Sequence, residues 1–212
     1  LVDIYLEHVE NNYSMRILKA KICLFKEKFD EVDDFINEEH DFNNLNLTQC
    51  LEIYALCKYR INDTLKLFEI LYSIRKAHDK EINIHMIYTQ EVLDSKFSFI
   101  NPLKVEYGMG VLLKYAGKEE LVFVSRDNPD LHKFNQFDKI INHEKGDKIT
   151  LETNLELEIL EIYNKFDYAF KDSLEIVQLN SSNYLKIYHF ESIEEHLEQM
   201  KEITLEKHNR LT

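Results

Sequence analysis

Apolar residues recur at intervals of three and four along the first hundred residues of the chain. Ile17, Ala20 and Leu24 form one such series, and Phe68 and Leu71 belong to another. This spacing places the apolar residues on one face of a helix, and residues 1–101 contain no glycine or proline to break it. We therefore expect helices near residues 2–11, 13–28, 30–38, 47–59, 63–78 and 81–95, with Asn62 or Asp63 as the N-cap of the fifth.

A weak internal repeat runs through this helical part. The segment "LFKEKFDEVDDFI" at 24–36 aligns with "LCKYRINDTLKLF" at 56–68, a spacing of 32, so that Phe29 matches Ile61 and Val32 matches Thr64. In each copy a helix ends and a polar pair opens the next one. The pattern resembles the tetratricopeptide repeat, a helix-turn-helix unit of about 34 residues. A plain helical bundle explains the same pattern, and both readings stay open.

The period of the apolar pattern changes from about 3.6 to 2 after Pro102. Three of the four glycines and both prolines lie between Pro102 and Asp130. The runs "GVLLKY" and "ELVFVSR" are typical of strands, and "AGKE" between them supplies Gly117 for a tight turn. We expect a β-hairpin there, ended by the turn-forming "RDNPD".

Further strands are expected downstream. Gly146-Asp147 should turn the chain into a strand at 148–152, and Thr153-Asn154 should turn it into a second at 155–162. The alternation in this second strand slips at Leu160, which indicates a β-bulge. "SLEIVQL" and "YLKIYHF", joined by "NSSN", read as two more strands. A terminal helix should follow, with a capping box formed by Ser192 and Glu195.

These patterns predict an α+β protein built from two parts. Residues 1–101 form a tetratricopeptide-like helical segment. Residues 102–212 form a small antiparallel β domain with a C-terminal extension that ends in the helix. We place the boundary between Lys96 and Glu106, where the helical period is lost and Pro102 arrives.

The β part resembles the C-terminal domain of the Gre transcript-cleavage factors. The similarity covers Gly110 to Phe166: the hairpin at 111–126, the acidic turn at 127–130, Gly146-Asp147, and the "ELEILEI" strand at 156–162. The resemblance implies an FKBP-like fold, in which a curved antiparallel sheet surrounds a short helix. It also makes RNA polymerase a candidate partner.

Helical repeats followed by a Gre-type domain resemble the tail of large bacterial proteins that carry an N-terminal PIN nuclease and belong to conflict or defence systems. The sequence begins with Leu1 rather than Met and shows no spaced quartet of acids typical of a PIN active site. We therefore expect the chain to be a fragment of a larger bacterial protein, with any catalytic domain outside it.

Acidic residues outnumber basic ones, and the net charge is −13. This charge disfavours broad nucleic-acid binding, because the phosphate backbone is also negative. The acids gather most densely in "DEVDDFINEEHD", which contains no Lys or Arg. Such a run is most often a solvated helix face and loop, but it is also the one candidate protein-docking surface. Its seven carboxylates are Asp30, Glu31, Asp33, Asp34, Glu38, Glu39 and Asp41.

The sequence offers little else that carries chemistry. Cys23, Cys50 and Cys57 are too few and too far apart for a disulfide framework or a zinc site. The nine histidines are scattered, and no phosphate loop or nucleophile motif occurs. A Cys–His nucleophile pair has no supporting motif. We expect no catalytic residue, no cofactor and no metal.

No run of about 18 apolar residues occurs, and the first residues, "LVDIYLEHVENN", lack the basic start of a signal peptide. A cytoplasmic protein is expected, without a membrane partner.

Three functions compete. The first is a non-catalytic interaction module that serves a larger bacterial protein and binds protein partners or other domains of that protein. The second is a Gre-like factor acting on RNA polymerase, with Glu38, Glu39 and Asp41 as its acids. The third, a prolyl isomerase, rests on fold analogy alone. The first is preferred, because the second needs a long coiled-coil hairpin that residues 1–100 do not form.

Overall fold

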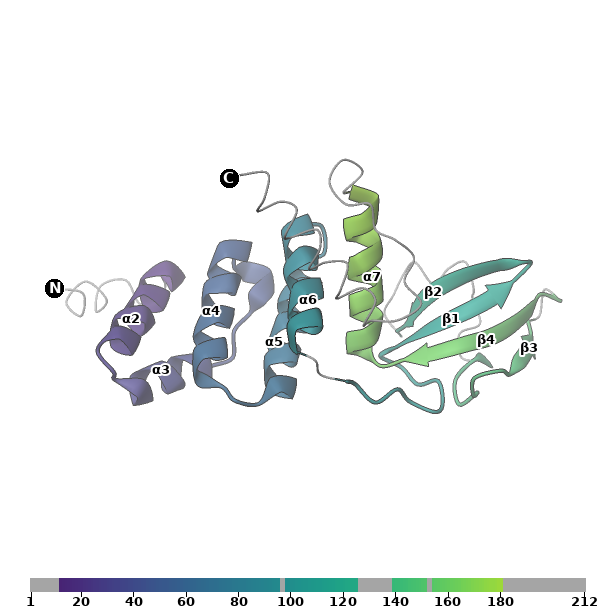
Figure 1. Ribbon diagram of the computed structural model, residues 1–212, viewed down its shortest axis with the longest axis horizontal. Coiled ribbons are helices and arrows are strands. Elements are labelled where there is room, and N and C mark those ends of the chain that lie inside the picture. The colour runs from purple at the N-terminus through teal and green to yellow at the C-terminus, as the bar shows by residue number, and fades with distance from the viewer. Residues whose placement is uncertain (1–11, 96–97, 126–138, 152–153, 181–212) are drawn as a thin grey trace, which may run out of the picture.

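Six α-helices and four antiparallel strands make up the part of the chain that the computed structural model describes, which is residues 12–95, 98–125, 139–151 and 154–180 (Figure 1). The expected α+β class is confirmed. The helices are α2 (Tyr13–Phe25), α3 (Phe29–Ile36), α4 (Leu47–Arg60), α5 (Thr64–Ala77), α6 (Ile82–Ser95) and α7 (Lys165–Asn180), with a 3-10 turn η1 (Phe42–Asn44) between α3 and α4. The strands are β1 (Met109–Tyr115), β2 (Lys118–Val124), β3 (Lys148–Thr150) and β4 (Glu156–Tyr163).

Five of the helices lie where the apolar spacing predicts them, with ends that differ by three residues or fewer. Polar side chains fix the starts. Asn46 and Gln49 form a reciprocal capping box on α4, and the Asp63 carboxylate accepts hydrogen bonds from the first backbone amides of α5. Asp63 is therefore the N-cap of α5. The helices expected at 2–11 and near the C-terminus lie outside the described residues.

Ion pairs and hydrogen bonds join neighbouring helices side by side. Lys21 of α2 bonds Glu52 of α4 at 2.5 Å, and Lys58 of α4 bonds Glu91 of α6 at 2.6 Å. A further hydrogen bond of 3.0 Å joins Lys66 of α5 to Asn37, the residue that follows α3. The helices beneath these contacts enclose a continuous apolar core, in which Ile53, Leu71, Ile74 and others are fully buried.

The strands form one antiparallel sheet in the order β2-β1-β4-β3. The expected hairpin is confirmed: Tyr115 pairs with Lys118 across a two-residue turn in which Ala116 and Gly117 have φ of 48° and 77°. Positive φ at both positions gives the twist that suits a tight hairpin.

The expected bulge is also present. Leu112 pairs with Glu161 whereas the next residue, Leu113, pairs with Ile159, so Leu160 is left unpaired in β4. β3 pairs with β4 as predicted, and Asn154 in the intervening turn has φ of 59°. Thr153 lies outside the described residues.

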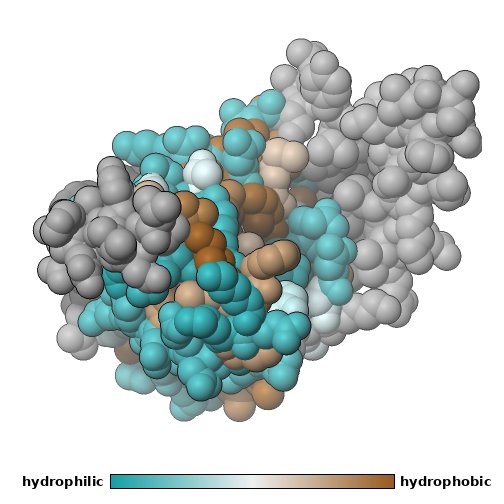
Figure 2. Space-filling model, turned by 90° about the vertical axis from the view of Figure 1, so that its left-hand side faces the viewer, coloured by the Kyte–Doolittle hydropathy of each residue, from teal (hydrophilic) through white to brown (hydrophobic). Residues whose placement is uncertain are grey.

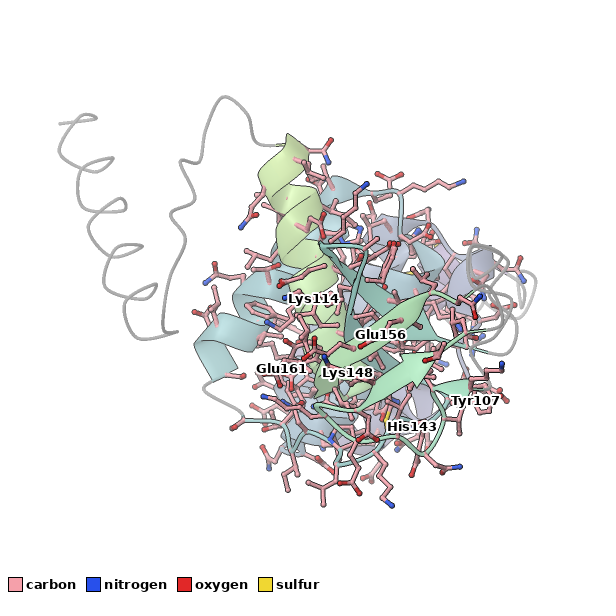
Figure 3. All side chains as sticks on the ribbon, turned by 90° about the vertical axis from the view of Figure 1, so that its right-hand side faces the viewer. Tyr107, Lys114, His143, Lys148, Glu156 and Glu161 are labelled. Carbon is pink, nitrogen blue, oxygen red and sulfur yellow. The ribbon has the colours of Figure 1, made fainter. Side chains whose placement is uncertain are left out.

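The sheet buries one face in an apolar core, whereas the other face meets Tyr168 of α7 near Gly110 and Phe123 and is charged toward β3. Leu157 and Ile159 of β4, together with Val111 and Leu113 of β1, pack into a second core. Charged side chains of the other face lie at the end of the molecule seen in Figure 3, where Lys148 of β3 pairs with Glu156 of β4 at 3.5 Å.

The segment "SLEIVQL", predicted as a strand, is instead the second half of α7. The prediction is wrong because the helix begins earlier, at Lys165. There the Asn164 side chain accepts hydrogen bonds from the amides of Phe166 and Asp167 at 2.9 and 3.0 Å. The buried residues of α7 follow helical spacing and are Phe166, Ala169, Ser173 and Val177. The expected partner strand, "YLKIYHF", lies outside the described residues.

α7 returns the chain from the sheet to the helices. Lys165 pairs with Glu69 and Ser173 bonds Arg75, so α7 runs in the same direction as α5. Figure 1 shows α7 rising from the end of β4 alongside α6, which runs the opposite way. Ala169 belongs to the helical core. Among the described residues, β1 to β4 follow α2 to α6 in sequence, but the two parts share α7 as a connecting element.

Candidate functional site

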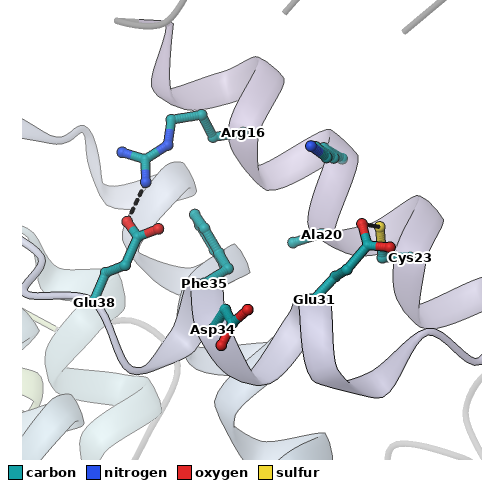
Figure 4. Close-up of a pocket in the computed structure, with 8 residues that line it drawn as sticks. Arg16, Ala20, Cys23, Glu31, Asp34, Phe35 and Glu38 are labelled. Carbon is teal, nitrogen blue, oxygen red and sulfur yellow. Dashed lines mark hydrogen bonds and ion pairs between the residues drawn. The ribbon is translucent and has the colours of Figure 1, made fainter. Parts of the chain in front are cut away.

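A groove of about 350 Å³ opens between α2 and α3 (Figure 4). It combines apolar and charged side chains from both helices. Its lining residues are Arg16, Lys19, Ala20, Cys23, Glu31, Asp34, Phe35 and Glu38. We call this the α2–α3 groove. Three of the seven candidate acids, Glu31, Asp34 and Glu38, therefore lie around one hollow.

The floor of the groove is apolar. Ala20, Cys23 and Phe35 are buried between the two helices. The turn that brings the helices together ends α2 with a Schellman motif, in which the Lys28 amide donates to the Cys23 carbonyl at 2.9 Å and the Glu27 amide to the Leu24 carbonyl at 3.0 Å. Glu27 has φ of 58°, so a non-glycine residue holds the left-handed position of this motif.

One rim of the groove is basic and comes from α2. The Arg16 guanidinium forms an ion pair with the Glu38 carboxylate and lies over the rings of Tyr13 and Phe35, at 5.0 and 5.7 Å from their centroids. Lys19, exposed, follows one turn later on the same helix. Arg16 therefore spans the groove and is held in place by three neighbours.

The other rim is acidic and comes from α3. The Lys28 ammonium donates to Glu31 at 2.7 Å and the Cys23 thiol donates to the same carboxylate at 3.2 Å, so the pKa of Glu31 lies below its usual value. Burial, with Glu31 close by, raises the pKa of the Cys23 thiol. Cys23 therefore acts as a hydrogen-bond donor to Glu31, and its raised pKa disfavours the thiolate. Asp34 is exposed at the groove edge.

The remaining candidate acids point elsewhere. Asp33 accepts two hydrogen bonds from Arg60 of α4, at 2.8 and 2.6 Å, and this contact lowers the pKa of its carboxyl. Asp41 bonds the amide of Asn43 at 3.1 Å and so begins η1. Asp30 and Glu39 are exposed and line no wall of the groove. The acid run is therefore divided between helix-joining contacts and the groove rim.

Exposed apolar side chains lie on the same end of the molecule. Leu18 of α2 is 43% exposed, and Phe25, the last residue of that helix, is 90% exposed. Figure 2 views this end and shows a strip of apolar surface between hydrophilic side chains. The end of the helical stack thus presents apolar and charged groups together.

The sequence did not identify the basic rim or the floor. Arg16 and Lys19 lie 14 and 11 residues before the first acid of the run, Asp30, and Phe35 lies within the run, but no local pattern singles them out. They meet only because the Schellman turn folds α3 back along α2. The spacing of Arg16 and Lys19 on one helical face, opposite a neighbouring acidic helix, was the available signal.

Cys50 and His78 are in contact, but the burial of Cys50 favours a structural role for the pair. Cys50 Sγ lies 3.3 Å from His78 Nε2, and burial raises the pKa of the Cys50 thiol to about 11. All three cysteines are buried and free. Within the described ranges, no three His, Cys, Asp or Glu side chains are grouped so as to hold a metal ion.

Among the described residues, every helix is too short or too polar to cross a membrane. No protein-family model matches the sequence. Comparisons with curated proteins and with solved structures found no match either.

Proposed function

We propose that the chain is a non-catalytic interaction module of a larger bacterial protein and that the α2–α3 groove is its binding site. The observation that carries this proposal is an apolar floor between a basic and an acidic rim at the end of a helical stack. An apolar side chain of a protein partner would enter the floor, while its flanking charges meet Arg16, Lys19 and Asp34. A cytoplasmic location is part of the proposal and agrees with three free thiols.

We further propose that the helices are tetratricopeptide-like repeats. The helices that begin at Tyr13, Leu47 and Ile82 start 34 and 35 residues apart, and those that begin at Phe29 and Thr64 start 35 apart. This period is closer to the repeat length of about 34 than the spacing of 32 expected from the sequence. The alignment at a spacing of 32 was out of register with the helices, because it matched Val32, inside α3, with Thr64, the first residue of α5.

The Gre-like, FKBP-like identity of the β part is likewise a proposal. It is supported by the hairpin of β1 and β2, the bulged β4 strand and the turn at Gly146, where φ is 90°. The short helix that the family places before this turn falls mainly on residues outside the described ranges. A role in a defence-system nuclease rests on the sequence resemblance alone.

Binding of peptides from a random displayed library would test the groove. We expect enriched peptides to combine an apolar residue with charged neighbours, and Asp34→Lys to weaken their binding by about tenfold or more, as loss of a central contact does. Asp30→Lys is the matched control, because Asp30 is exposed on the same helix and does not line the groove. Equal losses in both variants would instead indicate a general charge effect, and no enrichment would reject the groove as a peptide site.

The alternative, a Gre-like factor acting on RNA polymerase, receives less support from the contacts. Glu38 is engaged by Arg16, and Asp41 is engaged by the backbone of η1. Glu39, like the other two acids, is exposed. RNA polymerase is a candidate protein partner under both proposals. The interaction module would only bind it, whereas the Gre-like factor would also promote transcript cleavage.

A further inference from the structure

His40, in the loop between α3 and α4, is enclosed by aromatic rings. Its ring centroid lies 5.9 Å from that of Tyr13, 5.2 Å from that of Phe35 and 6.0 Å from that of Phe42. The Tyr13 hydroxyl bonds Nδ1. Nε2 is buried and has no hydrogen-bond partner among the described residues. The site therefore accommodates a neutral imidazole and satisfies one of its two nitrogens.

The enclosure of His40 adjoins the α2–α3 groove through Phe35. Phe35 forms part of the groove floor and also contacts the His40 ring. Arg16 on the basic rim lies over both Tyr13 and Phe35. A displacement of His40 would thus remove support from a floor residue and from the residues beneath the basic rim.

We propose that His40 is a proton-sensitive support of the α2–α3 groove: protonation drives its ring out of the aromatic enclosure, and Phe35 and the groove then rearrange. The reason is that the imidazolium carries two N–H donors and a charge. When Nδ1–H donates to the Tyr13 hydroxyl, Nε2 of the neutral ring carries no proton, and protonation turns it into a buried donor with no hydrogen-bond partner among the described residues. His40 is partly exposed, but its charge would still lie among aromatic rings, and both effects are unfavourable.

The charged and titratable groups around His40 come from every element packed on it. Tyr13 and Arg16 belong to α2, and Glu38, Glu39 and Asp41 belong to its own loop. Cys57 of α4 and Lys66 and Lys76 of α5 line the adjoining hollows. The acids are exposed and water-screened, so they offset the burial only in part.

The direction of the pH effect follows from burial. Burial lowers the pKa of His40 from its usual 6.5, with Arg16 acting in the same sense, while Glu38 and the Phe35 carbonyl oppose it. The folded state then binds fewer protons than the unfolded chain. The contribution of neutral His40 to stability, and with it the order of the groove, is fully present above about pH 6.5 and is lost as the pH falls through the lowered pKa.

An NMR titration of the intact chain from about pH 8 to about pH 5 tests this proposal over the range where histidines titrate. We expect the Ala20 methyl and Phe35 ring resonances to shift with the same midpoint as the His40 ring, below 6.5. In His40→Phe, which fills the enclosure without titrating, these shifts should disappear. His143→Gln is the control, because His143 is partly exposed beside Asp147 in the sheet part, and it should leave the shifts unchanged.

Two results would overturn the proposal. One is a His40 ring that titrates, or stays neutral, while the groove resonances do not move. The other is an equal groove shift in His40→Phe. If that variant does not fold, the agreement of midpoints in the unmodified chain decides the matter. The NMR titration needs no binding partner, so its outcome is independent of the peptide-binding test of the groove. The biological role of a proton-sensitive His40 does rest on the proposed function of the groove.

Discussion

Gly110 of β1 lies so close to Tyr168 of α7 that a Cβ atom at position 110 would be 2.5 Å from Tyr168 Cδ2 and 2.6 Å from Tyr168 Cβ. The Tyr168 ring also packs on Phe123 of β2, with centroids 4.9 Å apart. The sheet can therefore approach α7 only because residue 110 has no side chain. This contact fixes how the β part meets the helix that joins it to the stack.

Gly110→Ala should destabilise the fold by about 1–3 kcal/mol, as overpacking of a closely packed contact does. Chemical denaturation monitored by far-UV circular dichroism would measure the loss. Combining it with Tyr168→Gly, which removes the ring and also the Cβ atom at 2.6 Å, should recover part of the free energy of unfolding relative to the sum of the single variants, since the clash is removed. Simple additivity of the two variants would show that the close approach is not the cause.

Ser173 completes a buried chain of hydrogen bonds between α5, α6 and α7. The Arg75 guanidinium donates through Nε to Ser173 Oγ at 2.6 Å. His85 Nε2 lies 2.8 Å from the Asp79 carbonyl, so this nitrogen carries the proton and Nδ1 accepts from the Ser173 hydroxyl at 3.0 Å. Each polar atom of this hydrogen-bond network has its partner only while α7 keeps its present register.

Ser173→Ala should lower the free energy of unfolding by about 1–3 kcal/mol, because it leaves a buried donor on Arg75 and a buried acceptor on His85. Hydrogen exchange should also rise along α7. Ser73→Ala is the matched control: that hydroxyl bonds the Glu69 carbonyl on an exposed helix face, and its loss should change stability by about 0.5 kcal/mol or less. Similar effects in both variants would contradict a buried network.

Glu27→Gly should stabilise the chain by about 1 kcal/mol, because the left-handed conformation of Glu27 costs a non-glycine residue roughly that amount. Thermal unfolding would detect the gain as a higher midpoint. Glu27→Ala removes the same charge without relieving the backbone, and it should give no such gain. A gain of the same size in Glu27→Ala would assign the effect to charge.

The sequence predicted elements whose signal is local and missed one whose identity depends on distant contacts. The slip at Leu160 and the glycine at 117 are visible in a few neighbouring residues, and both features are found. "SLEIVQL" has the apolar content of a strand and no breaker. Its helical state follows from the cap at Asn164 and from burial of Ala169 and Ser173 against helices some 80 to 100 residues earlier. The window 173–179 does not contain that information, and the cap and the helical spacing appear only when the window extends back to Asn164.

The same distinction applies to the groove. The density of carboxylates at 30–41 identified its acidic rim, because charge runs are local. Which acids remain available was not predictable. Asp33 is used by Arg60, which is 27 residues away, and Glu38 by Arg16, which is 22 residues away. Partner choice of this kind is set by the packing of helices, not by spacing along one of them.

From the sequence, limited proteolysis should cut the chain first between Lys96 and Glu106 or within 127–130, where a turn is expected and which lies outside the described residues. The structure adds an expectation about the products. α7 packs on α6 and α5 through Ala169, Ser173 and Lys165, so a chain cut between α6 and β1 should stay associated. Size-exclusion chromatography of the nicked protein should give one peak with both fragments. Separation without denaturant would contradict this, and Ser173→Ala should make separation easier.

We finally predict that the chain alone neither cleaves RNA nor stimulates transcript cleavage by RNA polymerase. Cleavage of the Gre type, as the resemblance implies, needs carboxylates at the tip of a long hairpin, where they share a metal with the polymerase site. The acids here follow α3, which has 8 residues and spans only about 12 Å at about 1.5 Å per residue. A backtracking assay with the purified chain and Mg²⁺ is the measurement. Cleavage that disappears in Glu38→Ala, Glu39→Ala or Asp41→Ala, but persists in Asp30→Ala, would replace the interaction-module proposal with the Gre-like one.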